Sequence, residues 1–186
     1  MQNYYKPFNG YIEGYYGRLL NWDERNRIIR KLNRNNMSFY FYAPKEDDKH
    51  RLNWKKKYPS SWQQKFKQFC FNAKSNNIKV IVGISPGLNF NFLDFKEQAS
   101  KNKLSKDFQI LLRKTQEFLS YGSVEVGLLF DDLPNDFTNK YGNTFSEGSI
   151  HAELANRLSF FLKKSISVVP RIYADQLIDE DKNYLL

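Results

Sequence analysis

The chain contains five short runs of apolar, β-favouring residues, separated by stretches with the periodicity of a helix. The runs are Phe8–Ile12, Met37–Tyr42, Val80–Ile84, Val124–Phe130 and Ile166–Val169. Strands that alternate with helices favour a parallel α/β arrangement over an antiparallel meander. The runs are almost continuously hydrophobic, which is typical of strands that are covered on both faces. The sequence therefore predicts an α/β fold built from parallel strands.

Three of the intervening segments carry apolar residues at helical spacing. In one, Ser105 can cap a helix that ends before Gly122, and the inward stripe consists of Phe108, Leu111, Leu112, Thr115, Phe118 and Leu119. Another runs from Ser61 to Asn77, with Ser60 or Ser61 as the N-cap, and its inward residues are Trp62, Phe66, Phe69 and Ala73. The third stripe comprises Ile150, Leu154, Leu158, Phe161 and Leu162.

The length limits how much of a barrel these units can form. A complete (β/α)8 barrel of the TIM type needs about 250 residues, whereas this chain has 186. It supplies five βα units and then ends in a helix-like stretch, Asp175–Leu186, before a sixth strand. We therefore expect one domain over residues 1–186 with an incomplete TIM-barrel fold.

The net charge of +9 raises the question of a nucleic-acid partner. Lys and Arg are spread through the chain, and the one short cluster is Lys55-Lys56-Lys57. The sequence contains no helix-turn-helix, zinc-finger or RNP-like pattern that would organise these charges. We expect a basic surface without nucleic-acid binding.

The cysteine count and the apolar runs indicate in which cellular compartment the protein is expected. Because Cys70 is the only cysteine, the chain can form neither an internal disulfide nor a CxxC metal site. We expect Cys70 to be buried. The N-terminal residues do not have the pattern of a signal peptide, and no apolar run is long enough for a membrane span. The expectation is a cytoplasmic protein without membrane contact.

Polar and special residues follow each predicted strand. These segments are Glu13–Arg18, Ala43–Asp48, Ser85–Gly87, Asp131–Asp132 and Pro170–Tyr173. In parallel α/β folds the ligand site forms at the carboxyl ends of the strands. We therefore expect the five segments to meet at one site.

Asp131 and Asp132 end the fourth predicted strand, and three interpretations are open. Asp before a Pro-containing loop is common in turns and caps. A divalent metal would need further oxygen ligands, for which Asp47 and Asp48 are the obvious donors. Alternatively, two close carboxylates disfavour each other's ionisation, so that one stays protonated and can act as a general acid. Both can reach one pocket only if the chain turns there, and Leu133-Pro134 favours such a turn.

Four segments together resemble glycoside hydrolase family 84, the hyaluronidase-like bacterial β-N-acetylglucosaminidases and protein O-GlcNAcases. They read YIEGYYGRLLNWDER, FYFYAPKEDDKHRLNWKKKYP, GISPGLNFNF and GLLFDDL, in the family's order and at comparable spacing. The resemblance covers the chain from about Gly10 to Leu186. One departure is Gly17-Arg18-Leu19-Leu20, where the family has GRPW.

The resemblance implies roles for individual residues. Asp131 would orient and polarise the 2-acetamido group of the substrate, and Asp132 would be the general acid and then the general base. Gly14 would offer its backbone carbonyl to a sugar hydroxyl, and Tyr16 would line the same pocket. Lys45 would hydrogen-bond sugar hydroxyls. Tyr173, in VVPRIYAD, would meet the acetamide oxygen or the oxazoline formed from it.

The implied activity is that of a retaining glycosidase that removes β-linked N-acetylglucosamine. An ordinary retaining glycosidase places its nucleophilic carboxylate about 5 Å from the acid, across the sugar, and adjacent residues cannot easily do so. The substrate's acetamide would replace that nucleophile and form an oxazoline, so no metal or organic cofactor is required. The partner would be a carbohydrate that bears N-acetylglucosamine.

In the family, three further strands supply a Trp, Asn and Asp contacts to the sugar, and this sequence contains no counterpart. We expect the chain to be a fragment of a longer protein, or else to borrow those strands from a partner. The alternative to an enzyme is an inactive barrel fragment or a module that binds N-acetylglucosamine.

Overall fold

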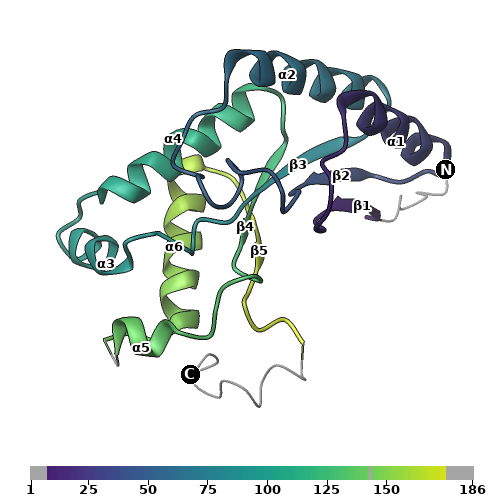
Figure 1. The fold of residues 1–186 in the computed structure, drawn as a ribbon. Helices are drawn as coiled ribbons and strands as arrows, with labels where there is room; N and C mark the ends of the chain where they lie inside the picture. Colours follow the sequence, from purple (N-terminus) through teal and green to yellow (C-terminus); the bar gives the residue numbers. More distant parts are fainter. Residues whose placement is uncertain (1–7, 143, 175–186) are drawn as a thin grey trace, which may run out of the picture.

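The computed structural model describes residues 8–142 and 144–174 and contains one sheet of five parallel strands (Figure 1). Their order in the sheet is their order in the chain: β1 (Gly10–Glu13), β2 (Phe39–Tyr42), β3 (Lys79–Ile84), β4 (Glu125–Leu129) and β5 (Ser167–Val169). Sequential parallel strands joined by helical crossovers form the start of a TIM-type barrel. The predicted incomplete α/β barrel is confirmed, with strand ends that differ from the apolar runs by one or two residues.

Helices connect the strands: α1 (Trp22–Arg34), α2 (Ser60–Ser75), α3 (Phe92–Ser100), α4 (Lys106–Ser120), α5 (Phe137–Tyr141) and α6 (Glu147–Leu162). Figure 1 shows α1, α2, α4 and α6 along one face of the sheet. The large core lies between these helices and the strands and is rich in aromatic side chains, among them Tyr40, Phe66, Phe118 and Phe130. The predicted helix over Asp175–Leu186 lies outside the described residues.

Two helix ends were predicted correctly from local chemistry. Ser105 Oγ accepts a hydrogen bond from the Phe108 amide at the start of α4. Gly122, just past the end of that helix, has φ of 111°, in the left-handed region that favours glycine.

One expectation about the helices was wrong, and two short helices were not predicted. Pro59 is the N-cap of α2, so Ser60 and Ser61 already lie inside the helix. Ser146 is the N-cap of α6, and its side chain accepts a hydrogen bond from the Ser149 amide. The short helices α3 and α5 were not predicted, since each lies in a loop segment without a long apolar period.

Side chains alternate between the two faces of the sheet. Tyr40 and Tyr42 face the helices, whereas Phe41 and Ala43 pack on the inner face with Ile81 and Leu129. The inner cluster is possible because Phe41 lies over glycines: an added Cβ at Gly127 would lie 2.6 Å from Phe41 Cζ. At the β1 edge the inward-facing Ile12 is 58% exposed. The described residues thus form a half-barrel whose inner face is covered in part.

Among the described residues, none of the helices is both long and apolar enough to span a bilayer.

Both histidines are buried in the core. The His50 ring contacts the Gly83 carbonyl oxygen through Nδ1 at 2.9 Å, and burial lowers its pKa to about 4. His151 stacks on Phe130 with ring centroids 3.8 Å apart, and burial, aided by Arg171, lowers its pKa to about 3. Each ring is therefore neutral in the folded chain at neutral pH.

We predict that the free energy of unfolding falls as the pH falls from 6.5 to about 4. In that window the unfolded chain binds protons at His50 that the folded chain does not, so the stability present above pH 6.5 is lost. His50→Gln should reduce the pH dependence by up to about 3 kcal/mol. Urea titrations at a series of pH values measure it. An unchanged slope in the variant would show that His50 does not cause the effect.

Candidate active site

Lys45 and the two aspartates meet at the carboxyl ends of β2 and β4. Lys45 Nζ lies 2.7 Å from Asp131 Oδ2 and 2.6 Å from Asp132 Oδ2. The lysine side chain is 4% exposed, and the two carboxylates are 22% and 25% exposed. One ammonium group therefore pairs with both carboxylates at the border between core and solvent.

Strand alternation and one turn bring these groups together. Beyond β2, Ala43 faces inward, and Lys45 two residues later keeps that side. In the same way, Asp131 comes two residues after the inward-facing Leu129 and lies on the same side. The Leu133 amide donates to the Phe130 carbonyl at 3.3 Å, and this turn lets Asp132 approach Lys45 as well.

The charge of Lys45 bears on one of the three interpretations of the pair. Burial of the Asp132 carboxyl acts to raise its pKa, but Lys45, Tyr16 and Arg51 together lower the pKa below its ordinary value. One interpretation was that mutual repulsion between the aspartates can keep one of them protonated. In this arrangement the ammonium between them offsets that repulsion, so Asp132 is ionised at neutral pH.

Asp131 retains an unused acceptor. Its Oδ2 accepts from Lys45, whereas Oδ1 is buried and accepts no hydrogen bond from the residues that the structure describes. A buried carboxylate oxygen without a donor is costly. The arrangement suits a ligand that brings an N–H group to this oxygen.

Tyr16 and Arg51 border Asp132 on the solvent side. The Arg51 guanidinium carbon lies 5.9 Å from the centre of the Tyr16 ring, and Nη2 lies 3.5 Å from the Asp132 carbonyl oxygen. Burial and, next to it, the interaction with Asp132 raise the pKa of the Tyr16 hydroxyl. Arg51 is not among the predicted site residues, because its approach to Asp132 follows only from the fold of residues 43–59.

Two predicted ligand-binding residues lie at the rim. The carbonyls of Glu13 and Tyr15 accept from amides of the segment that continues β2, and since successive carbonyls alternate, that of Gly14 points away from it. Tyr173 follows β5 and is 64% exposed. The structure gives it no hydrogen bond to the aspartates, so its role stays a prediction.

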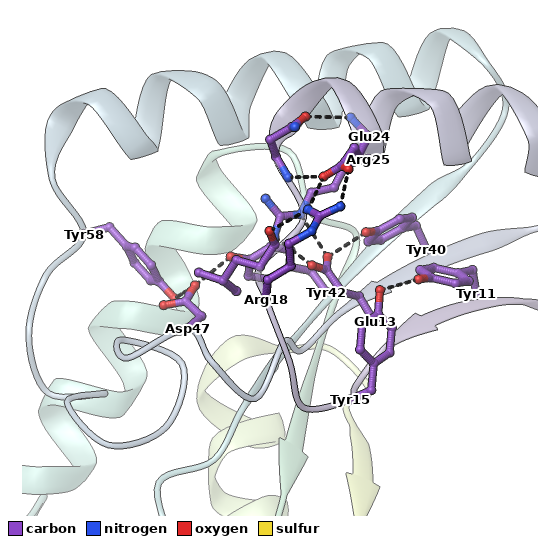
Figure 2. A network of polar contacts seen from close by, with 12 residues as sticks. Tyr11, Glu13, Tyr15, Arg18, Glu24, Arg25, Tyr40, Tyr42, Asp47 and Tyr58 are labelled. Atoms are coloured by element: carbon purple, nitrogen blue, oxygen red, sulfur yellow. Dashed lines mark hydrogen bonds and ion pairs between the residues drawn. The ribbon is translucent and has the colours of Figure 1, made fainter.

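Other polar residues after the strands serve the core instead (Figure 2). Glu13 is buried and accepts from Arg25 Nε at 2.9 Å, from Arg25 Nη2 at 2.7 Å and from the Tyr40 hydroxyl at 2.6 Å. Arg18 pairs with Glu24 on α1 at 2.6 Å. Of the five segments predicted to meet at one site, three contribute residues to it: Tyr16, Lys45 and the two aspartates. Within the described residues, the structure gives no contact of Ser85–Gly87 or Tyr173 with the aspartates.

Asp47 is likewise occupied. Its Oδ2 accepts from the Tyr42 hydroxyl at 2.6 Å and from the Tyr58 hydroxyl at 2.9 Å, as Figure 2 shows. Asp48 forms a hydrogen bond with Asn53 at 2.6 Å. Across the described residues, His, Cys, Asp and Glu form no group of three or more that could hold a metal ion. The alternative of a site shared by Asp47, Asp48 and the Asp131 pair thus has no support in this geometry.

Comparison with known proteins assigns the chain to a family. The family model described as beta-N-acetylglucosaminidase matches residues 9–185. The Protein O-GlcNAcase of Rattus norvegicus is 30% identical over 146 residues, which cover 78% of this chain and 15% of that protein. The Protein O-GlcNAcase of Mus musculus matches with the same identity and coverage.

Solved structures agree with this match. A mutant of the Thermobaculum terrenum O-GlcNAc hydrolase superposes with a TM-score of 0.74 and 28% identity, over 90% of this chain and 35% of that chain. The protein CpGH84B superposes with a TM-score of 0.68 and 29% identity, over 82% of this chain and 24% of its own. The chain thus spans 15% of the length of the curated relatives and about a third or less of these solved chains.

We predict that Lys45→Met raises the pKa of Asp132 by about 1 unit, because the nearest cation is lost and repulsion from Asp131 returns. Titration of ¹³C-labelled aspartate carboxyls by NMR measures this shift. Lys57→Met, which removes an exposed charge, is the control and should leave the titration unchanged. Identical titrations in the wild-type and Lys45→Met chains would contradict the electrostatic role of Lys45.

We also predict that Arg25→Met destabilises the fold by about 3–5 kcal/mol, because it leaves Glu13 charged and buried without its cation. The double substitution Glu13→Gln with Arg25→Met should recover part of the loss, since the uncompensated charge is gone. Chemical denaturation measures both. If the double variant were less stable than Arg25→Met, the buried charge would not be the cause.

Proposed function

We propose, from the premise that this chain belongs to the β-N-acetylglucosaminidase family, that it forms one side of a glycosidase pocket for β-linked N-acetylglucosamine. The observation that carries the proposal is the contact of Lys45 with two adjacent carboxylates at the carboxyl ends of the strands. The relatives' names include hydrolases of O-linked N-acetylglucosamine, which supports the same class of substrate.

Substrate-assisted catalysis fits this geometry. Both carboxylates come from one strand end and share one ammonium group, so they cannot stand on opposite faces of a sugar about 5 Å apart. The nucleophile is then the carbonyl oxygen of the substrate's own 2-acetamido group, which attacks the anomeric carbon. Asp131 Oδ1, buried and without a donor among the described residues, accepts the acetamide N–H and orients the group for attack.

Asp132 moves the proton in both steps. As the acetamide oxygen bonds to the anomeric carbon, the bond to the leaving oxygen breaks and Asp132 protonates that oxygen. Asp131 stabilises the positive charge that develops on the acetamide as the oxazoline forms. Asp132, now ionised, removes a proton from water as the water oxygen attacks the anomeric carbon and reopens the ring, so configuration is retained. The residues named need no metal or organic cofactor for these steps.

Lys45 serves sugar binding and proton supply together. When sugar hydroxyls accept hydrogen bonds from its ammonium, Asp132 shares that cation with the ligand, and the pKa of Asp132 rises. Gly14 contributes its carbonyl, and Tyr16 contributes the wall beside Asp132. Tyr173, exposed after β5, contacts the acetamide or the oxazoline.

A second candidate function is binding of N-acetylglucosamine without hydrolysis. The exposed Ile12 and the exposed Tyr173 favour it, because the described residues enclose the sugar from one side only. A chain that binds N-acetylglucosamine through Lys45 but does not cleave an aryl glucosaminide would support this function instead.

We predict that Asp132→Ala lowers the hydrolysis of a methylumbelliferyl N-acetyl-β-glucosaminide on the order of 10²–10⁴-fold, because the leaving oxygen loses its acid. A dinitrophenyl substrate, whose leaving group needs no proton, should lose much less activity in its first step. Asp136→Ala, an exposed aspartate in the same loop, is the matched control. Equal losses with both substrates would remove Asp132 from the role of acid.

A further inference from the structure

Lys114, in the middle of α4, is a buried lysine that the proposed reaction does not use. It is 5% exposed, and its ammonium donates to the carbonyls of Lys49, Trp54 and Lys56 at 2.7, 2.5 and 2.8 Å. A lysine ammonium has three N–H donors. Each donor is therefore used, and all three acceptors belong to one loop, residues 43–59 between β2 and α2.

This loop carries Lys45 and Arg51 to the aspartates. On the strand side it is tied by Asp47, which accepts from the Tyr42 hydroxyl on β2, and by the contact of His50 with the Gly83 carbonyl on β3. The Tyr58 hydroxyl also donates to Asp47, within the loop. Its far part, around Trp54 and Lys56, is tied to α4 by Lys114. Lys114 thus binds the backbone of the loop to α4 with three hydrogen bonds, whereas Lys55 and Lys57 reach Asp107 and Glu117 of α4 only through their side chains, at 2.7 and 3.6 Å.

The surroundings of Lys114 bind its ammonium group, but burial disfavours the charged form. Burial lowers the pKa of the Lys114 ammonium to about 8, and the nearby charge of Lys49 lowers it further. The negative charges of Asp47, Glu117 and Asp48 act in the opposite direction. The Tyr58 ring, 4.8 Å from Nζ, adds a cation–π contact. A neutral amine would have two N–H donors for three carbonyls, so deprotonation would leave one buried carbonyl without a partner.

We propose that Lys114 is a positioning residue: through the β2–α2 loop, its ammonium holds Lys45 and Arg51 against Asp132. The proposal rests on the proposed function in one respect only: the proposed function explains why Lys45 and Arg51 need to be held beside Asp132. Its physical content, that removing the ammonium on α4 changes the charge environment of Asp132, can be tested on the chain whether or not it hydrolyses a sugar.

The test is Lys114→Met, which keeps the apolar stem and removes the donors. The amides of residues 46–57 should exchange with solvent deuterium about tenfold faster than in the wild type, while those of α6 do not change. In an NMR titration of labelled carboxyls the pKa of Asp132 should rise by about half a unit or more, because Lys45 and Arg51 are no longer held beside it. A merely structural lysine would not move that pKa.

Two control variants separate positioning from other effects. Lys56→Met removes the same charge from an exposed site on the same loop, and Leu154→Ala destabilises the core at α6, away from the loop. Neither should change the Asp132 titration. If Lys114→Met leaves the titration unchanged, or if Leu154→Ala shifts it equally, the proposal is overturned.

The wild-type chain provides a test that needs no substitution. As the pH rises through about 8, exchange at residues 46–57 should accelerate beyond the intrinsic rate, relative to the α3–α4 connection at residues 101–104. No relative acceleration by pH 10 would contradict the proposal even if the variant does not fold. Absence of sugar hydrolysis with an intact Lys114 effect would instead count against the proposed function alone.

Discussion

The ion pair of Lys45 with two adjacent aspartates depends on the alternation of side chains along parallel strands. Because β2 and β4 both flank β3 in register, Ala43 and Leu129 share the inner face, and the residues two positions later, Lys45 and Asp131, meet beyond the strand ends. The same alternation turns Glu13 and Tyr42 toward the helices, where their polar groups are satisfied by Arg25 and Asp47. One geometric rule thus separates the polar groups that support the pocket from those that face it.

The supporting groups lie at depths where an unpaired charge would be costly, and each is fully occupied. Arg25 gives two hydrogen bonds to Glu13 while its guanidinium lies 4.8 Å from the centre of the Trp22 ring. Lys114 uses all three donors on loop carbonyls. By contrast, Asp131 Oδ1 accepts from no described residue. The contrast between satisfied support and an unsatisfied pocket oxygen is the physical reason to assign binding to Asp131 and structure to Glu13, although both are carboxylates at strand ends.

Much of this arrangement could be predicted from the sequence, and the rest depends on information that local patterns do not contain. The apolar runs indicated five parallel strands, and Ser105 and Gly122 indicated the ends of α4, because caps and left-handed residues act within one turn. Whether Glu13 or Gly14 faces the pocket depends on strand register, and the approach of Arg51 to Asp132 depends on how a seventeen-residue loop (43–59) folds back. Lys114 lies 65 positions from the Lys49 carbonyl it binds. The position of Lys45 was implied by the family resemblance, whereas its effect on the pKa of Asp132 required the distances.

That effect changes how the acid of the proposed reaction obtains its proton. With Lys45 against both carboxylates, Asp132 is held ionised, which suits the second step, in which it acts as base. The first step needs the opposite state. A sugar that draws the ammonium toward its hydroxyls weakens the attraction that lowers the pKa, and the repulsion between the adjacent carboxylates then favours protonation of one of them. In the proposed reaction Asp131 faces the acetamide N–H and the developing positive charge, and Asp132 faces the leaving oxygen, which is where the proton is needed. In the proposed reaction, sugar binding and protonation of Asp132 are then coupled through the charge of Lys45. The strength of this coupling depends on how firmly the loop holds Lys45 beside the carboxylates.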